Sequence, residues 1–165
     1  MGPDFAFDTI KIPISLWATV IWDLRRRGGG VRESGAFLLG RDDTNPAHVS
    51  AYICYDDVDP AAYQHGAIVF HASGCAALWQ HCKKLDLQLL VDVHTHPGGD
   101  VRQSPIDVRH PMMPVAGHTA MIVPNYAHTK WWSLKAVGVY EYLNGFDWCT
   151  HPAAAANRRV KLSLW

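Results

Sequence analysis

The stretch VHTHPGGDVRQSPID, residues 93 to 107, places two histidines, a serine and two aspartates around a pair of glycines. Side chains alternate along a strand, so His94 and His96 point to one face, about 6.6 Å apart along the backbone, while Thr95 faces the core. Two imidazoles at this separation can lean together onto one ion, because zinc–nitrogen bonds are about 2.0 Å long. Pro97 and the glycines then end the strand and turn the chain. The pair therefore predicts part of a metal site at a strand end.

The segment Ser104-Pro105-Ile106-Asp107 has the form of a helix start. Serine is favoured at the N-cap and proline at the first helical position. The serine and the aspartate, three residues apart, then lie on one side of the turn. If this turn folds back over the strand end, Asp107 adds an anionic ligand. Three protein ligands with an open fourth position are typical of a catalytic zinc site rather than a structural one.

Each part of this pattern also has a plain structural reading. H-x-H is a weak signal by itself in a chain of 165 residues with 10 histidines, and Ser-Pro-x-Asp is most often only a helix cap. A catalytic zinc site also needs a base for its water, and Glu33, in the run RESGAFLLG, is the candidate. Because Glu33 immediately precedes an apolar strand, a solvated surface glutamate is the alternative, and its position alone does not decide between them.

Taken together, these residues resemble the signature of the JAMM zinc metalloproteases, also called JAB or MPN-plus proteins. That signature is a glutamate, then H-x-H, seven residues and S-x-x-D. Here it reads Glu33, His94-Thr95-His96, residues 97 to 103 and Ser104-Pro105-Ile106-Asp107. RESGAFLLG is similar to the family's first strand, and MIVPNYA followed by GVYEYLNGFDW is similar to the later strands of bacterial members found beside ubiquitin-like E1 and E2 genes. The resemblance runs from about residue 14 to residue 148.

The resemblance implies one catalytic zinc ion, Zn2+, held by His94, His96 and Asp107 with water as the fourth ligand. It implies Glu33 as the general base for that water and Ser104 as the hydroxyl that stabilises the oxyanion. These are the two catalytic residues and the three metal ligands that we expect.

For the fold, the resemblance implies a single JAB/MPN domain over residues 1 to 165, of the α/β class. Its sheet should be mixed and mostly antiparallel, flanked by helices in a cytidine deaminase-like architecture. For the activity, it implies cleavage of the peptide or isopeptide bond after the C-terminal tail of ubiquitin or a ubiquitin-like protein. Cognate E1- and E2-like proteins of a bacterial conjugation pathway, with antiphage defence as one setting, are the expected partners.

Two other functions stay open. One is a metabolic zinc hydrolase of the same fold that acts on a sulfur-carrier protein or a small peptide. The other is a non-catalytic MPN scaffold, which the complete set of motif residues disfavours.

Asp92 departs from the family pattern, in which eukaryotic members usually carry an aromatic residue and bacterial members often a glutamate. By alternation Asp92 shares the face of His94 and His96, so it is either a partner of a ligand histidine or a solvated strand residue. Seven further histidines lack a spaced partner set and are expected in packing or surface roles: His65, His71, His81, His110, His118, His128 and His151. Packing is also favoured over partner binding for two aromatic stretches, Trp131-Trp132 and the C-terminal LSLW.

These candidates need helices and strands to position them. Apolar residues spaced by three and four predict an amphipathic helix over residues 14 to 27, closed by glycines, and a second helix over residues 73 to 85. Apolar, β-branched and aromatic runs predict strands over 35–40, 48–58, 87–96, 118–125, 135–143 and 160–165. One mixed α/β domain follows from this succession.

The bulk composition narrows the class of protein. A hydrophobic fraction of 48% and a charged fraction of 18% are typical of a compact soluble chain. Lys plus Arg and Asp plus Glu balance at 15 each, which disfavours nucleic acid and acidic membranes as partners. Four cysteines without a C-x-x-C pair, together with the lack of a signal peptide or a bilayer-length apolar run, predict a reduced, cytoplasmic protein.

Overall fold

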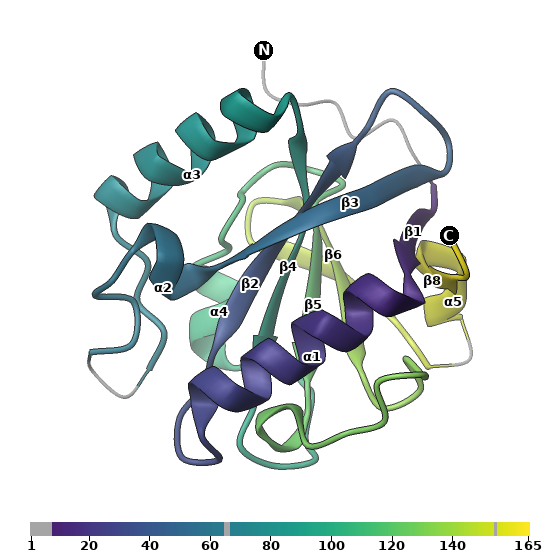
Figure 1. The fold of residues 1–165 in the computed structure, drawn as a ribbon. Helices are drawn as coiled ribbons and strands as arrows, with labels where there is room; N and C mark the ends of the chain where they lie inside the picture. The colour runs from purple at the N-terminus through teal and green to yellow at the C-terminus, as the bar shows by residue number, and fades with distance from the viewer. Residues whose placement is uncertain (1–7, 65–66, 154) are drawn as a thin grey trace.

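The computed structural model describes residues 8–64, 67–153 and 155–165, and within them the strands form one sheet in the order β7-β6-β5-β4-β2-β3-β1-β8 (Figure 1). The strands are β1 (Ile10–Pro13), β2 (Gly35–Arg41), β3 (Ala47–Cys54), β4 (Gln88–Thr95), β5 (Thr119–Val123), β6 (Gly138–Asn144), β7 (Asp147–His151) and β8 (Val160–Ser163). The helices are α1 (Ile14–Gly28), α2 (Tyr55–Val58), α3 (Ala72–Leu85), α4 (Pro105–Arg109), the 3-10 turn η1 (Asn125–Ala127) and α5 (Ala156–Arg159). None of these described helices has both the length and the apolar composition that a bilayer-spanning helix requires.

The sheet is mixed, with more antiparallel than parallel neighbours. β1 pairs in parallel with β3 and β8, and β4 pairs in parallel with β5. The other four neighbouring pairs are antiparallel. The predicted α/β class with a mostly antiparallel sheet is therefore confirmed. The cytidine deaminase-like comparison and the single domain over residues 1 to 165 stay predictions.

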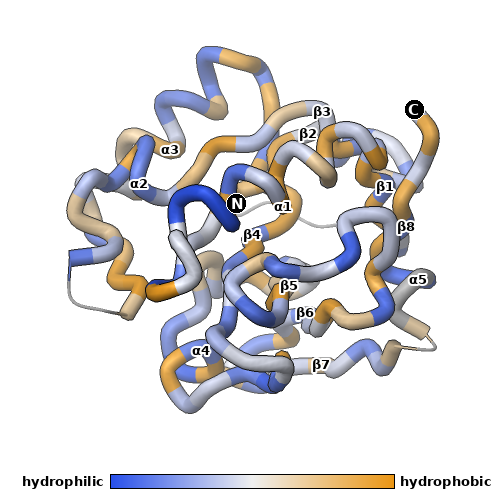
Figure 2. Tube along the Cα trace, turned by 60° about the horizontal axis from the view of Figure 1, so that its bottom comes forward, coloured by the Kyte–Doolittle hydropathy of each residue, from blue (hydrophilic) through white to orange (hydrophobic). Residues whose placement is uncertain are grey.

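Helices cover both faces of the sheet at β2. Ala36 and Leu38 pack into a cluster with α1, whereas Phe37 and Leu39 face the opposite side and pack with residues of α3. The run is apolar at successive positions because side chains that alternate along a strand meet a helix on either face. Figure 1 shows α1 and α3 at different sides of the central strands, and Figure 2 shows the hydrophobic residues gathered along those strands.

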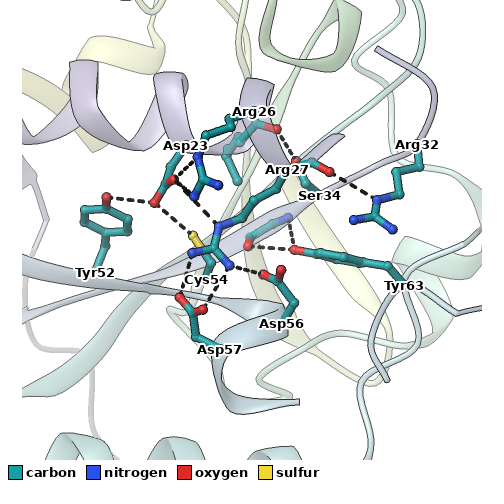
Figure 3. Close-up of polar contacts among 12 residues, drawn as sticks. Asp23, Arg26, Arg27, Arg32, Ser34, Tyr52, Cys54, Asp56, Asp57 and Tyr63 are labelled. Atoms are coloured by element: carbon teal, nitrogen blue, oxygen red, sulfur yellow. Dashed lines mark hydrogen bonds and ion pairs between the residues drawn. The ribbon is translucent and has the colours of Figure 1, made fainter. Parts of the chain in front are cut away.

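The strand predicted over residues 48–58 was too long. It ends at Cys54, and the next four residues form α2. Ion pairs with α1 favour this helix: Arg27 Nη1, near the end of α1, lies 2.6 Å from Asp56 Oδ1 and 2.9 Å from Asp57 Oδ1. Figure 3 shows the Arg27 side chain between α1 and the two aspartates of α2. These ion pairs hold α2 against the end of α1, while the Tyr55 side chain is buried on the opposite face of the sheet, against Phe37 and Phe70.

The other differences lie at the ends and edges of elements. The strands predicted over 118–125, 135–143 and 160–165 are shorter, and β1 and β7 were not predicted. Leu85, the last residue of α3, is 42% exposed, although Leu78 and Cys82 of the same helix are buried. The aromatic stretches lie largely on the surface: Trp131 is 43% exposed, Trp132 55% and Trp165 87%, which excludes core packing for these three residues. Leu162, in contrast, packs against the core from β8, the strand at the edge of the sheet.

Candidate metal centre

Three side chains from two separate segments meet beyond the end of β4. His94 Nε2 lies 3.2 Å from His96 Nε2 and 3.3 Å from Asp107 Oδ1, and His96 Nε2 lies 3.4 Å from Asp107 Oδ2. Two donor atoms bound to one tetrahedral zinc ion, each at about 2.0–2.1 Å, are roughly 3.3 Å apart. Two imidazole nitrogens and a carboxylate oxygen at these separations therefore fit a zinc ion, and the structure brings the three predicted ligands together.

The His96 imidazole is oriented by its other ring nitrogen. Nδ1 lies 3.0 Å from the backbone carbonyl oxygen of Asp100, and a proton donated there leaves the Nε2 lone pair to face the other two ligands. The backbone of His96 is held as well, because its N–H donates to Val123 at 2.9 Å and its carbonyl accepts from Tyr126 at 2.9 Å. The residues of η1 all have left-handed φ values, and this turn at the end of β5 lets Tyr126 reach back to the ligand loop.

Asp107 is oriented by the helix that it begins. The structure confirms the predicted cap: Ser104 Oγ accepts from the Asp107 N–H at 3.2 Å, and Asp107 Oδ2 accepts from the Ser104 N–H at 2.7 Å. Burial opposes ionisation, but hydrogen bonds from His94 and His96 outweigh it and hold the pKa of the Asp107 carboxyl well below its usual range. Asp107 therefore presents a fixed, ionised carboxylate to both imidazoles.

Glu33 lies two residues before β2, the strand that pairs with β4. Gly35 of β2 pairs with His94 of β4, and two-residue alternation places Glu33 on the same face as that histidine. Burial raises the pKa of the Glu33 carboxyl, the Asp107 carboxylate acts in the same direction, and the charges of His94 and His96 oppose them. Glu33 is therefore a partly buried carboxylate beside the candidate ligands, and the solvated surface interpretation is wrong.

Glu33 and the metal ligands share one cavity of ≈ 800 Å³. Ser104 also lines it, so the structure brings all five predicted site residues to a single opening. The rest of its wall is largely apolar and comes mainly from the loop before α3 and the segment after α4: Ala67, Ile68, Val69, Phe70, Ile106, Met112, Pro114 and Phe146.

Thr95 connects the ligand strand to the segment that carries Glu33. Its side chain is fully buried on the core side, as predicted. Its hydroxyl accepts from the Ser34 N–H at 3.0 Å, and its own N–H donates to the Ser34 carbonyl at 2.9 Å. Ser34 Oγ donates in turn to the Leu24 carbonyl of α1 at 2.8 Å. This polar role of Thr95 has no local sequence signal, because the partner of its hydroxyl is 61 residues away.

Asp92 has a partner that was not predicted. The side chain is 3% exposed, and its Oδ1 lies 2.5 Å from His118 Nε2. Both residues are buried, so Asp92 is not a solvated strand residue, and the packing role expected for His118 includes a polar contact.

Two further contacts hold the Asp107 segment against the sheet: Tyr140 Oη donates to the Val101 carbonyl at 2.5 Å, and Trp148 Nε1 donates to the Val108 carbonyl at 3.1 Å.

The zinc affinity of this site should fall as the pH is lowered. The hydrogen bond with Asp107 raises the pKa of His96 above its ordinary value, although burial acts against it. A protonated imidazole cannot bind metal, so below that pKa each pH unit should weaken zinc binding by about tenfold or more. Competition titrations with a zinc-sensitive dye measure this, and an affinity that stays constant from roughly pH 7.5 to about pH 5.5 would contradict it. Asp107 makes no contribution to the slope, because it stays ionised throughout this range.

Similar folds occur among solved structures. No known family profile matches the chain. The solution structure of protein DSY2949 from Desulfitobacterium hafniense superposes with a TM-score of 0.63 at 14% identity, covering 94% of this chain and 93% of that one. A protein from Salinibacter ruber superposes with a TM-score of 0.53 at 18% identity, covering 85% and 87%. The chain shares the fold of these proteins.

A third similar structure comes from a protein of a named family. AF2198 from Archaeoglobus fulgidus is a JAB1/MPN domain protein, with a TM-score of 0.46 and 17% identity over 81% of this chain and 88% of that one. This similarity is too low to assign the family.

Proposed function

We propose that this chain is a JAMM-type zinc peptidase that cleaves the bond after the C-terminal tail of ubiquitin or a ubiquitin-like protein. The observation that carries this proposal is the convergence of five motif residues on one cavity. His94, His96 and Asp107 present their donor atoms at zinc-compatible separations, and Glu33 and Ser104 line the same opening. A structural zinc site would offer four protein ligands, whereas three ligands beside an acid–base carboxylate suit hydrolysis.

The residues divide the work of peptide hydrolysis as follows. When bound, zinc supplies an acidified water and polarises the scissile carbonyl. Glu33 accepts the proton of the attacking water and returns it to the departing amine, so that it acts first as general base and then as general acid. Ser104 Oγ accepts from the Asp107 N–H, which leaves its own proton to donate to the oxyanion that develops on the carbonyl oxygen. Neither role requires a cysteine nucleophile.

The shape of the cavity supports a polypeptide substrate. Besides the motif residues, the cavity is lined largely by apolar side chains from the loop before α3 and the segment after α4. An extended peptide presents side chains on one face and carbonyl groups along its length. Apolar side chains of such a tail can pack against the wall while one carbonyl reaches Glu33 and Ser104. The proposal also includes a bacterial ubiquitin-like conjugation pathway, E1- and E2-like proteins as partners, and a cytoplasmic location.

The test is cleavage of a ubiquitin-like protein fused at its C-terminus to a reporter. We expect the zinc-loaded protein to release the reporter directly after the modifier's last residue, a chelator to abolish the activity, and added zinc to restore it. A short peptide with the same tail sequence serves as the second substrate. Cleavage of the short peptide alone would replace this proposal by a metabolic peptidase, and absence of bound zinc after purification and zinc addition would favour a non-catalytic scaffold.

A further inference from the structure

The direction of the Glu33 carboxylate depends on the backbone that follows it. Glu33 lines the same cavity as the metal ligands, and none of the described residues forms a hydrogen bond with its carboxylate. Gly35, two residues on, pairs with His94, so the backbone of Ser34 and Gly35 fixes the place from which the Glu33 side chain projects. Ser34 is fixed by Thr95 on the ligand strand, as described above.

Gly35 is fixed from the opposite side by Tyr63. The Tyr63 hydroxyl accepts from the Gly35 N–H at 2.9 Å and donates to the Gly35 carbonyl at 3.2 Å. Figure 3 shows Tyr63 with its hydroxyl group in hydrogen bonds. Both hydrogen-bonding capacities of one hydroxyl are thus used on a single backbone residue. A Cβ on Gly35 would lie 2.2 Å from the buried ring of Tyr55, so this position has no side chain that could hold the backbone instead.

Tyr63 takes a place that a neighbouring strand would normally fill. β2 lies between β4 and β3, and Gly35 pairs with His94 on the β4 side. On the other side, the pairing with β3 begins only at Ala36, opposite Cys54, because the chain turns there into α2. The N–H and carbonyl of Gly35 would lack partners at this edge, and the tyrosine hydroxyl satisfies both.

The loop that carries Tyr63 is itself anchored. The carboxylate of Asp59 is buried and accepts from the Ala61 N–H at 3.1 Å and from the His71 N–H at 2.7 Å, which ties the two ends of the loop together. Val69 donates to the carbonyl of Ala62, next to Tyr63, at 2.9 Å.

The outer face of the Tyr63 ring is covered by Arg32, whose guanidinium carbon lies 5.2 Å from the ring centre. The same loop supplies Ile68 and Phe70 to the wall of the cavity. The cavity wall and the clamp on Gly35 are therefore parts of one anchored loop.

We propose that Tyr63 is a positioning residue for Glu33, which it aims at the metal ligands by clamping Gly35. The loop that contacts the substrate thereby also sets the direction of the general base. This inference rests on the proposed function for its kinetic consequence, but not for its structural one.

The structural consequence is measurable without any substrate. The chain contains only two glutamates, Glu33 and Glu141, so protein made with glutamate labelled with 13C at the side-chain carboxyl gives two carboxyl signals. We expect Tyr63→Phe, which removes one oxygen and keeps the ring, to move the Glu33 signal of the zinc-loaded protein and to leave the Glu141 signal in place. The matched control is Tyr52→Phe, which removes a hydroxyl bonded to Asp23 at 3.1 Å and away from Gly35; it should move neither signal.

The kinetic consequence is a selective loss of turnover. Tyr63→Phe should lower kcat by about ten- to a hundredfold, because small misplacements of a catalytic group are costly. KM should stay within about twofold and zinc content at one ion per chain. The thermal midpoint should fall below that of Tyr52→Phe without loss of zinc, because the N–H and carbonyl of Gly35 both lose their partner. A general loss of structure would instead lower the thermal midpoint and the zinc content together.

The two proposals fail in different ways. An unmoved Glu33 signal in Tyr63→Phe, or a kcat equal to that of Tyr52→Phe, overturns the positioning role. Absence of hydrolysis in the unmodified zinc-loaded protein counts against the proposed function alone, and in that case the carboxyl signals still decide whether Tyr63 aims Glu33.

Discussion

Glu33→Gln should keep one zinc ion per chain and lose hydrolysis by on the order of a hundred- to ten-thousandfold. Glutamine has the same shape as glutamate but cannot accept the proton of the attacking water, and general acid–base catalysis by one side chain contributes about this much. None of the three candidate ligands is altered, so metal binding should survive. Rates of fusion cleavage and zinc content measure the two effects on the same preparation.

The control for this substitution is the other glutamate. Glu141 pairs with His151 at 3.0 Å on the β6–β7 side of the sheet, and Glu141→Gln should retain activity within about twofold. Robust turnover by the Glu33→Gln protein would remove Glu33 from the mechanism. His96→Ala, in contrast, should lose both zinc and hydrolysis, which separates a lost base from a lost ligand.

Asp107→Asn should lose zinc while α4 stays folded. The amide oxygen of asparagine can still accept from the Ser104 N–H in place of Oδ2, so the cap persists. The negative charge is lost, and an NH2 group without a free lone pair replaces Oδ1, the oxygen that faces His94. Loss of a residue that only supports a ligand typically weakens metal binding by about ten- to a hundredfold, and loss of a ligand should exceed this. Dye competition measures the affinity, and circular dichroism of the metal-free proteins shows whether the fold is kept.

A nearby aspartate provides the matched control. Asp100 lies in the same loop and its carboxylate pairs with Arg102 at 2.6 Å on the surface. Only its backbone carbonyl contacts His96, so Asp100→Asn should bind zinc as the unmodified protein does. Equal zinc affinity in Asp107→Asn and Asp100→Asn would show that Asp107 is not a ligand.

Local patterns predicted the parts of the site that depend on neighbours in sequence. Strand alternation placed His94 and His96 together and turned Thr95 away. The Ser104–Asp107 segment predicted a helix start with Ser104 at its N-cap, which the structure contains together with a reciprocal bond from Asp107. The two main helices and β2 followed from periodicity, because each buries an apolar stripe or run. These features depend on residues that are close together in the sequence.

Contacts between distant residues were beyond such patterns. The position of Glu33 in the sequence did not distinguish a general base from a surface glutamate, and its burial beside His94 follows from the pairing of β2 with β4. Tyr63 carries no local signal, because its partner is 28 residues away. The early end of β3 depends on ion pairs between α2 and Arg27, and the burial of Asp92 depends on His118 in the next strand region. Each of these requires the tertiary fold.

The cap at the start of α4 also governs how the metal is exchanged. The Asp107 carboxylate accepts from the Ser104 N–H within the turn that begins α4, and His96 is held through its backbone and its Nδ1. The chelating groups are thus preorganised, and little conformational entropy remains to be lost when an ion arrives. Protein stripped by a chelator should therefore reload rapidly and without refolding, at a rate set by the encounter with the ion and the departure of the His96 proton.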